Sequence, residues 1–389
     1  MHIMVLWQGN YPWDVRIDKF VRSFVRMGHS VTVLSSNTNN MPRDGTYLGA
    51  AVRRLPHYGI FRRVLQMPVP FSPIWRHHAA QSAALQAPNV VMVRDLPLMQ
   101  IGYRVAKANR AKLWFDMAED YPATFEHLES SAISRLTVRN YNVARRYEKW
   151  ALSVADHVTV VIDESLERVN KLFPDREPGW SQVITNAPDD YFLSQLSCVG
   201  HVLPFTDGLR ALYHGNLEAK RGLDTVMNAL GILKDRGVVV KMTILGNPEH
   251  ERQRLLRYAS TRRIGDLLDI RPPVTYEQLP GAISQCQIGL VPHVWCEHTA
   301  TTIPNKLFDM MALAKPVIVS SVPPLRRVVE GAQCGLVYRW DSPVELANAL
   351  QYVATHADVA EHMGQNGLRA YNEVYAWRHC EPVIAEILG

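Results

Sequence analysis

Residues 209–230 read LRALYHGNLEAKRGLDTVMNAL. A short apolar run ends at a glycine, a polar loop follows, and apolar residues at helical spacing begin after Gly222, which predicts a strand, a loop and a helix. Lys220 and Arg221 stand directly before that helix. A helix N-terminus carries partial positive charge and free N–H groups, and arginine offers a planar fork, so the loop is typical of a phosphate or diphosphate site. A surface loop with solvated cations is the alternative interpretation.

The same strand and helix alternation extends outward in both directions. The second half continues through VVKMTILG (239–246), QIGLVPH (287–293) and PVIVSS (316–321), and the first half contains HIMVLW (2–7) and NVVMVRD (89–95). Strands that alternate with helices predict parallel sheets covered on both faces. Because single cores stop growing near ~250–300 residues, the 389 residues predict two domains. We therefore expect an α/β protein with two Rossmann-like, doubly wound domains that face a cleft.

Turn-forming residues without a sustained period, from about Pro174 to Leu209, mark the expected linker. The predicted organisation is an N-terminal Rossmann-like domain (1–190), a linker (191–209), a C-terminal Rossmann-like domain (210–370) and a C-terminal helix (371–389) that packs back toward the first domain.

Composition and charge narrow the function classes. Five scattered cysteines form no CxxC pair, the opening MHIMVLW is too short for a signal peptide, and no stretch approaches the ~20 apolar residues of a membrane span, so we expect a cytoplasmic protein. Residues 1–150 hold 20 Lys and Arg against 10 Asp and Glu, whereas the whole chain is only +5. This asymmetry predicts an anionic partner for the first half, or else a solvated basic face.

A second motif, HTATTIPNKLFDMMALAKPVIVSS (298–321), precedes a strand. It places Pro304 at the expected first position of a helix, whose free N–H groups would point at an anion. Asp309 lies about one turn into this helix, where its carboxylate can accept hydrogen bonds from vicinal hydroxyls such as those of a ribose. Compensation of the helix dipole is the alternative role for Asp309.

Taken in order, these fragments resemble the retaining glycosyltransferases of family 4, the glycosyl transferases group 1, which have the GT-B fold. The resemblance runs through GNYPWDVRIDKFVRSFVRMGHSVTVLS (9–35), VRDLPL, FDMAED, VITNAPD (183–189), YHGNLEAKRGLD and PNKLFDMMALAKPVIVSS. It implies a nucleotide-diphosphate sugar on the second domain, with a UDP-sugar favoured over a GDP-sugar, and a glycan or polyprenyl-linked acceptor on the first. It further implies hexosyl transfer with retention, in surface polysaccharide or glycolipid synthesis, without a metal or another cofactor.

The resemblance assigns some residues by motif, and others are nearby candidates. His293 follows a strand end that should face the cleft, with a loop histidine satisfied by its surroundings as the alternative. Arg94 and Asp95 end a strand of the first domain, with a capping or ion-pair role as the alternative. The expected catalytic residues are Arg221, Lys220 and Glu119; the donor-binding residues are Gly215, Asn216, Gly222, His293, Thr301, Thr302, Asn305, Lys306 and Asp309; and the acceptor or cleft side holds Gly9, Asn10, Asp14, Arg94 and Asp95.

Three positions depart from the family pattern. Thr301 stands where a glutamate often lies near the donor sugar, Asn216 where many members have arginine, and Ala118 where a histidine is common. Sugar contacts would then come from Glu297, His298 or backbone N–H groups. A catalytically silent nucleotide-sugar-binding subunit and a sugar-nucleotide epimerase of the same fold therefore remain alternatives. A dehydrogenase is disfavoured because the first strand leads into GNYPWD and not into GxGxxG, and nucleic-acid binding has no recognition motif behind it.

The stretch YGIFRRVLQMPVPFSPIWRHH (58–78) interleaves cations with aromatic and aliphatic residues. Segments at membrane interfaces combine these residue types, since cations attract anionic headgroups and aromatic rings settle at the interface. We therefore expect peripheral contact with an anionic membrane surface, at the inner face of the plasma membrane. A loop that packs over the acceptor side is the competing interpretation.

Overall fold

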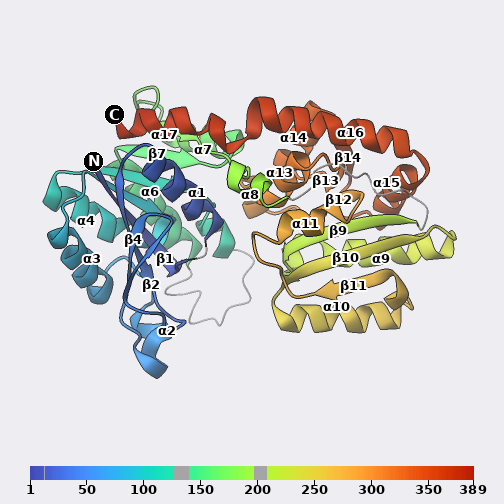
Figure 1. Ribbon diagram of the computed structural model, residues 1–389, viewed down its shortest axis with the longest axis horizontal. Helices are drawn as coiled ribbons and strands as arrows, with labels where there is room; N and C mark the ends of the chain where they lie inside the picture. Colours follow the sequence, from blue (N-terminus) through green and yellow to red (C-terminus); the bar gives the residue numbers. More distant parts are fainter. Residues whose placement is uncertain (13, 126–139, 197–207) are drawn as a thin grey trace. The chain divides into compact units, whose positions relative to one another are not determined.

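The computed structural model describes residues 1–12, 14–125, 140–196 and 208–389 (Figure 1). It divides into two compact units, Met1–Thr185 with Cys380–Gly389, and Asn186–His379. Each unit contains its own sheet flanked by helices, which confirms the predicted α/β class with two Rossmann-like domains. The chain passes between the units before the expected linker (191–209), of which residues 197–207 lie outside the described part.

The first unit is built on an eight-stranded sheet in the order β3-β4-β2-β1-β5-β6-β7-β8. All neighbours are parallel except the hairpin of β3 and β4, and the central strands are buried because helices cover them. The strands are β1 (His2–Asn10), β2 (Ser30–Ser36), β3 (Asp44–Tyr47), β4 (Ala50–Arg54), β5 (Val90–Arg94), β6 (Lys112–Met117), β7 (His157–Val160) and β8 (Ser181–Val183).

Helix α1 (Val15–Arg26) shows why the helices of this unit form and dock. The Asp14 side chain accepts hydrogen bonds from the N–H groups of Arg16 and Ile17, a standard N-cap. The buried face of α1 then packs Phe20 edge-to-face on Trp114 of β6, with ring centroids 5.3 Å apart. The other α-helices among the described residues of this unit are α2 (Arg62–Leu65), α3 (Pro73–Leu85), α4 (Met99–Asn109), α6 (Tyr141–Val154), α7 (Asp163–Leu172) and α17 (Glu381–Leu388).

The second unit has a six-stranded, fully parallel sheet in the order β11-β10-β9-β12-β13-β14, with β9 and β12 adjacent at its centre. Its strands are β9 (Leu209–Asn216), β10 (Val240–Asn247), β11 (Leu268–Arg271), β12 (Ile288–Val291), β13 (Val317–Ser320) and β14 (Gly335–Tyr338). Its α-helices are α8 (Asp190–Ser194), α9 (Leu223–Asp235), α10 (Glu249–Thr261), α11 (Leu279–Ser284), α12 (Glu297–Ala300), α13 (Asn305–Ala312), α14 (Pro323–Ala332), α15 (Pro343–Thr355) and α16 (Ala357–Ala370).

The chain returns to the first unit at its end, where α17 packs on that unit. Glu381 accepts a hydrogen bond of 2.9 Å from Ser23 Oγ on α1, and Lys112 Nζ donates to the carbonyl of Ile387 at 3.3 Å. Within the described ranges no helix combines the length and the apolar composition that crossing a membrane requires.

Candidate active site

The predicted phosphate loop lies at the carboxyl ends of β9 and β12. After β9 the chain makes a short 3₁₀ turn, Ala219–Arg221, and then enters α9 at Gly222, whose φ is +71°. A Cβ at this glycine would overlap the carbonyl oxygen of Pro292, so only glycine lets the loop approach the end of β12. The N–H of Val294 donates to the carbonyl of Lys220 at 2.9 Å, which fixes the two loops side by side.

Basic side chains converge between these loops. A nitrogen of the Arg221 guanidinium lies 3.3 Å from Nε2 of His293, while Arg221 Nε is buried without a hydrogen-bond partner among the described residues. Lys306, from the first turn of α13, places its Nζ 4.0 Å from the centroid of the Tyr213 ring. The Lys306 side chain also lies beside Gly215, where a Cβ would be 3.2 Å from Nζ. Lys220 contributes a third cation and pairs with Glu218 at 3.5 Å.

Burial and mutual repulsion make this cluster electrostatically unfavourable when no anion is bound. Burial lowers the pKa of Lys306 well below its usual value, and Arg221 lowers it further, while Asp309 opposes the shift. Burial likewise lowers the pKa of His293 well below 6.5, and the neighbouring Arg221 and Lys306 lower it further. A group of cations that disfavour one another is the arrangement expected of a site that binds a polyanion.

His214 and Asp309 form a second, buried part of the site. His214 follows Tyr213 on β9, and its Nε2 lies 3.6 Å from Oδ2 of Asp309. Burial lowers the pKa of His214 to about 3, and Lys306 adds to the effect, so the imidazole is neutral at pH 7. Its Nε2 has no hydrogen-bond partner in the described part of the chain. The pair therefore offers a neutral imidazole next to a buried carboxyl group, a combination suited to hydroxyl groups of a ligand.

The second motif folds much as expected, with one correction. Helix α13 begins at Asn305, and Pro304 is its N-cap and not its first helical residue, because its ψ of 144° is extended. No side chain caps this N-terminus, so its amide groups are available to a ligand. Thr301 follows α12 and donates its hydroxyl to the carbonyl of Glu297 at 2.9 Å, and Thr302 is buried in the segment between the two helices.

Asn216 has a local structural contact. Its Oδ1 accepts a 2.8 Å hydrogen bond from the N–H of Glu218, and its carbonyl accepts one from the Tyr213 hydroxyl. The amide thus shapes the loop that carries Lys220 and Arg221.

The first unit gathers its predicted residues at the carboxyl edge of its own sheet. The guanidinium of Arg94, at the end of β5, forms an ion pair with Asp14 and lies 4.6 Å above the Trp7 ring. The Trp7 ring covers the backbone of Gly9, where a Cβ would be 2.8 Å from it. Asn10 Oδ1 accepts a hydrogen bond from the N–H of Thr38, and Asn10 Nδ2 donates one to the Thr38 hydroxyl, both at 2.7 Å.

Asp95 is the unusual residue of this edge. Its φ of 63° and ψ of 164° lie in a region that non-glycine residues rarely adopt, and its side chain is only 6% exposed. Burial raises the pKa of Asp95 to about 7, with further upward contributions from Glu119, Asp116 and Asp14, while Arg94 opposes them. Oδ1 of Asp95 has no hydrogen-bond partner among the described residues. Strain and an unsatisfied buried oxygen at one position indicate a functional group.

The structure thus brings the predicted residues together in two groups, one in each unit. In the second unit Arg221, His293, Lys306 and Asp309 interact directly or electrostatically. In the first unit Arg94 forms an ion pair with Asp14, and the charge of the exposed Glu119 raises the pKa of Asp95. The described residues include no group of three or more His, Cys, Asp and Glu placed to hold a metal ion.

Sequence reasoning missed Tyr213 and His214. Both belong to the quoted YHGN segment, but a strand pattern shows only that neighbours point to opposite faces. It does not show that one ring would support a buried lysine and the other would reach Asp309.

Comparisons with known proteins support what the geometry indicates. Residues 14–179 match the family model described as glycosyl transferase 4-like domain, and residues 208–356 match that of glycosyl transferases group 1. The D-inositol 3-phosphate glycosyltransferase of Paenarthrobacter aurescens (strain TC1) is 21% identical over 183 residues. That match covers 46% of this chain and 43% of the relative, so it spans less than half of the relative's length.

Solved structures match over the whole chain. The sucrose-phosphate synthase from Thermosynechococcus elongatus superposes with a TM-score of 0.81 at 17% identity, covering 99% of this chain and 98% of that one. Anabaena Alr3699/HepE in complex with UDP gives a TM-score of 0.71 at 13% identity, covering 100% and 99%. At such identities the likeness shows the fold. The two family models and this shared fold together place the chain among the glycosyltransferases of the GT-B fold.

Proposed function

We propose that this glycosyltransferase uses a nucleotide-diphosphate sugar whose diphosphate binds to Arg221, Lys306 and Lys220 in the second unit. The observation that carries the proposal is the convergence of the partly buried Arg221 on the buried His293 and Lys306, where Arg221 and Lys306 lower the pKa of His293. A diphosphate placed there would neutralise the repulsion and accept hydrogen bonds from the guanidinium fork. The free N–H groups at the start of α13 would add donors to the same anion.

The same groups would assist the chemical step. In glycosyl transfer the bond between the anomeric carbon and the phosphate oxygen breaks, and a bond to an acceptor oxygen forms. Negative charge grows on the departing diphosphate, where fixed cations stabilise it more strongly than in the ground state. The buried position of Lys306 strengthens this effect because few water molecules screen it. This arrangement supports transfer without a bound metal.

Asp309 and His214 are proposed to bind hydroxyl groups of the donor. The carboxylate of Asp309 can accept from two vicinal hydroxyls, as predicted for a ribose, and His214 lies 3.6 Å from it. Among the solved neighbours, Anabaena Alr3699/HepE was determined with UDP and with UDP-glucose. These complexes favour a UDP-sugar over a GDP-sugar as the donor of this chain.

On the first unit, Asp95, Arg94 and Asp14 are proposed to line the acceptor side. Asp95 Oδ1 is available to accept a hydrogen bond from an acceptor hydroxyl. We propose a glycan or a lipid-linked glycan as the acceptor, transfer with retention, and a role in surface polysaccharide or glycolipid synthesis at an anionic membrane surface. These finer assignments rest on the family resemblance and on the basic first half of the chain.

The test is a thermal-shift and ligand-observed NMR panel of UDP, GDP and their common sugar conjugates. Arg221→Ala is compared with Arg257→Ala, an exposed arginine of α10 in the same unit. We expect one nucleotide to bind selectively, Arg221→Ala to abolish that binding and Arg257→Ala to leave it unchanged. Binding that survives in Arg221→Ala would refute the site. Nucleotide binding without donor hydrolysis or transfer would instead support a silent binding subunit.

A further inference from the structure

A segment of the first unit exposes an unusual number of apolar side chains. Residues 58–71, here called the tip segment, include α2, which extends away from the sheet in Figure 1. The described residues have 16 large hydrophobic side chains that are exposed, and six of them fall within these 14 positions. They are Ile60, Phe61, Val64, Leu65, Met67 and Phe71, with Ile60 85% and Phe71 75% exposed. Contiguous apolar exposure of this kind marks an interaction surface.

The tip segment is nevertheless held in place. Gln66 is only 3% exposed; its Oε1 accepts from the N–H of Asn37 at 2.5 Å, and its Nε2 donates to the carbonyls of Asn37 and Pro56 at 3.1 and 3.0 Å. The indole N–H of the buried Trp75 donates to the carbonyl of Gln66 at 3.1 Å. These hydrogen bonds fix the middle of the segment at Gln66, while the apolar side chains on either side of Gln66 are exposed.

Charge around the tip segment has a single sign. The sequence contains no Asp or Glu between Asp44 and Asp95, while the same stretch holds six arginines. Arg62 and Arg63 lie within α2 itself, between the exposed apolar residues. The partner of this surface therefore has to be both apolar and anionic.

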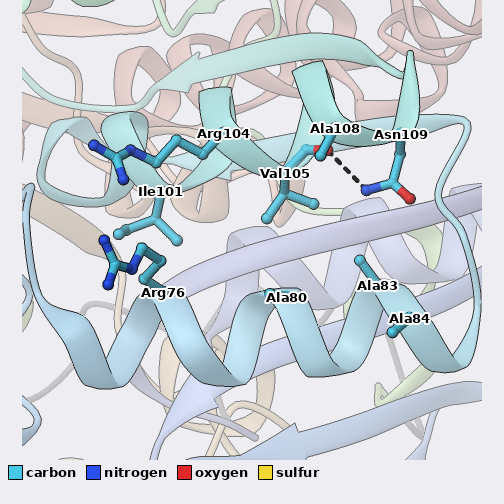
Figure 2. A pocket seen from close by; sticks show the side chains of 9 residues that line it. All are labelled: Arg76, Ala80, Ala83, Ala84, Ile101, Arg104, Val105, Ala108 and Asn109. Carbon is cyan, nitrogen blue, oxygen red and sulfur yellow. Dashed lines mark hydrogen bonds between the residues drawn. The ribbon is translucent and has the colours of Figure 1, made fainter.

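The cationic surface continues onto α3 and α4, which follow in the chain. An open cavity of about 220 Å³ lies between these helices and is lined mostly by alanine and other apolar side chains (Figure 2). Arg76 and Arg104 lie together at one end of it, and neither guanidinium has a hydrogen-bond or ion-pair partner in the described part of the chain. Arg76 is five positions after Phe71 and so lies close in sequence to the tip segment, and Arg104 of α4 lies beside Arg76 (Figure 2).

We propose that the tip segment and the Arg76 and Arg104 pair bind the surface of an anionic phospholipid bilayer. The exposed apolar side chains would enter the interfacial region, where aromatic and aliphatic groups are stabilised. The four arginines would bind phosphates of the headgroups, to which the guanidinium fork is matched. This proposal names the membrane-binding surface of the proposed function, and it is independent of the donor chemistry.

A bilayer fits this surface better than a second copy of the chain does. Two tip segments that met face to face would bring Arg62 and Arg63 of each copy together with no carboxylate in either segment, and like charges oppose such contact. An anionic bilayer has an apolar interior directly beneath a negatively charged surface, so it can bind both kinds of side chain. An acidic, apolar protein partner is the remaining occupant, and the experiment separates it from the bilayer.

The experiment is co-sedimentation of the full chain with vesicles of phosphatidylglycerol and phosphatidylcholine, compared with pure phosphatidylcholine. The apolar variant is Ile60→Ser/Phe61→Ser/Phe71→Ser, and its control is Val143→Ser, an exposed apolar residue of α6 in the same unit. The charge variants are Arg62→Gln/Arg63→Gln and Arg76→Gln/Arg104→Gln. Their control is Arg146→Gln/Lys149→Gln, two exposed cations of α6.

We expect the natural chain to bind the anionic vesicles and not the pure phosphatidylcholine vesicles. The affinity for anionic vesicles should fall at least about tenfold in the apolar variant. It should fall about fivefold for each arginine removed, since one headgroup contact contributes about 1 kcal/mol. The control variants should bind as the natural chain does. No binding of the natural chain to anionic vesicles, equal loss in variants and controls, or dimers that disappear in the apolar variant would overturn the proposal. UDP thermal shifts on the same variants report folding and the donor site, so a failure of the proposed function is recognised separately.

Discussion

The two units place groups of opposite character at the carboxyl edges of similar parallel sheets. The edge of the second unit gathers Arg221, Lys306 and Lys220 around neutral imidazoles, with Asp309 as a buried carboxyl group nearby. The edge of the first unit gathers four carboxyl groups around two arginines; these carboxyl groups are Asp14, Asp95, Asp116 and Glu119. The sheet thus fixes where ligands bind, whereas the few residues that follow each strand fix the charge of the ligand. A diphosphate suits the second edge and a hydroxyl-rich acceptor the first.

Within the first edge, two buried aspartates contrast sharply. The Asp116 carboxylate accepts two hydrogen bonds from the guanidinium of Arg16, at 2.8 and 2.6 Å, and one from the hydroxyl of Thr159 at 2.8 Å. Asp95 has a strained backbone and an unpartnered oxygen. The first is a structural ion pair, and the second is available for function.

The largest effects on stability should come from replacing each of these two aspartates by asparagine. Asp116→Asn removes the negative charge that pairs with the buried Arg16, so we expect a loss of about 3–5 kcal/mol in the free energy of unfolding. Asp95→Asn should instead raise that free energy at pH 8 by about 1–3 kcal/mol, because it removes a buried carboxylate that has only a 3.9 Å contact with Arg94 and one oxygen without a hydrogen bond. Chemical denaturation at pH 5 and pH 8 measures both.

The pH dependence of Asp95 has a definite sign. Its pKa is about 7 in the folded chain and near 3.8 when unfolded, so the folded state binds more protons between these values. The ionised Asp95 therefore lowers stability as pH rises from about 4 to about 7, and Asp95→Asn should remove this decline. If Asp95→Asn destabilised the chain as strongly as Asp116→Asn does, the contrast between the two aspartates would be wrong.

A substitution in the phosphate loop should have the next largest effect. Gly222→Ala introduces a Cβ that overlaps the Pro292 carbonyl at a φ of +71°, so we expect a loss of about 3 kcal/mol of stability together with weakened UDP binding. Gly231→Ala in α9 is the control, because nothing lies within 4 Å of its Cβ position and alanine favours a helix. Thermal melts with and without UDP report both quantities; equal behaviour of the two variants would contradict the close approach of the loops.

Lys306→Met tests whether the second edge is built for an anion and not for stability. The substitution keeps most of the side-chain volume but removes the buried amine, so we expect UDP affinity to fall about 100-fold, the value of a charge-assisted contact. The melting temperature without ligand should stay equal or rise, because the repulsion from Arg221 disappears. A large loss of stability with unchanged affinity would make Lys306 a structural residue.

The sequence was sufficient for the fold because both halves repeat one local pattern. LRALYHG and HIMVLW each predict a buried strand that ends in a polar loop, and the observed β9 and β1 follow these runs closely. The parallel register then brings the strand ends to one edge without further information. The exact start of α13 was less predictable, because proline is favoured at N1 and here occupies the N-cap.

Side-chain partnerships across the sheet could not be predicted in the same way. Asp14 was expected on the cleft side, and the structure shows it as the N-cap of α1 and the partner of Arg94, which lies 80 positions away. The strained backbone of Asp95 depends on the path of the chain after the end of β5, and no residue type in VRDLPL predicts it. Long-range contacts and backbone strain are tertiary properties, which local sequence patterns do not encode.

The smallest expected effect is a proton exchange that accompanies nucleotide binding at the second edge. Burial and the neighbouring cations lower the pKa values of Lys306 and His293, so His293 is largely neutral near pH 7 without ligand and the charged form of Lys306 is disfavoured. A bound diphosphate raises both pKa values because opposite charge favours the protonated forms. Binding of UDP near pH 7 should therefore take up protons, and the affinity should weaken as pH rises. Calorimetric titrations in buffers of different ionisation enthalpy measure the uptake, which should decrease in Lys306→Met. The Asp95→Asn variant should leave it unchanged, since that carboxyl belongs to the other edge; no proton uptake on binding would mean that Lys306 and His293 do not change protonation when the diphosphate binds.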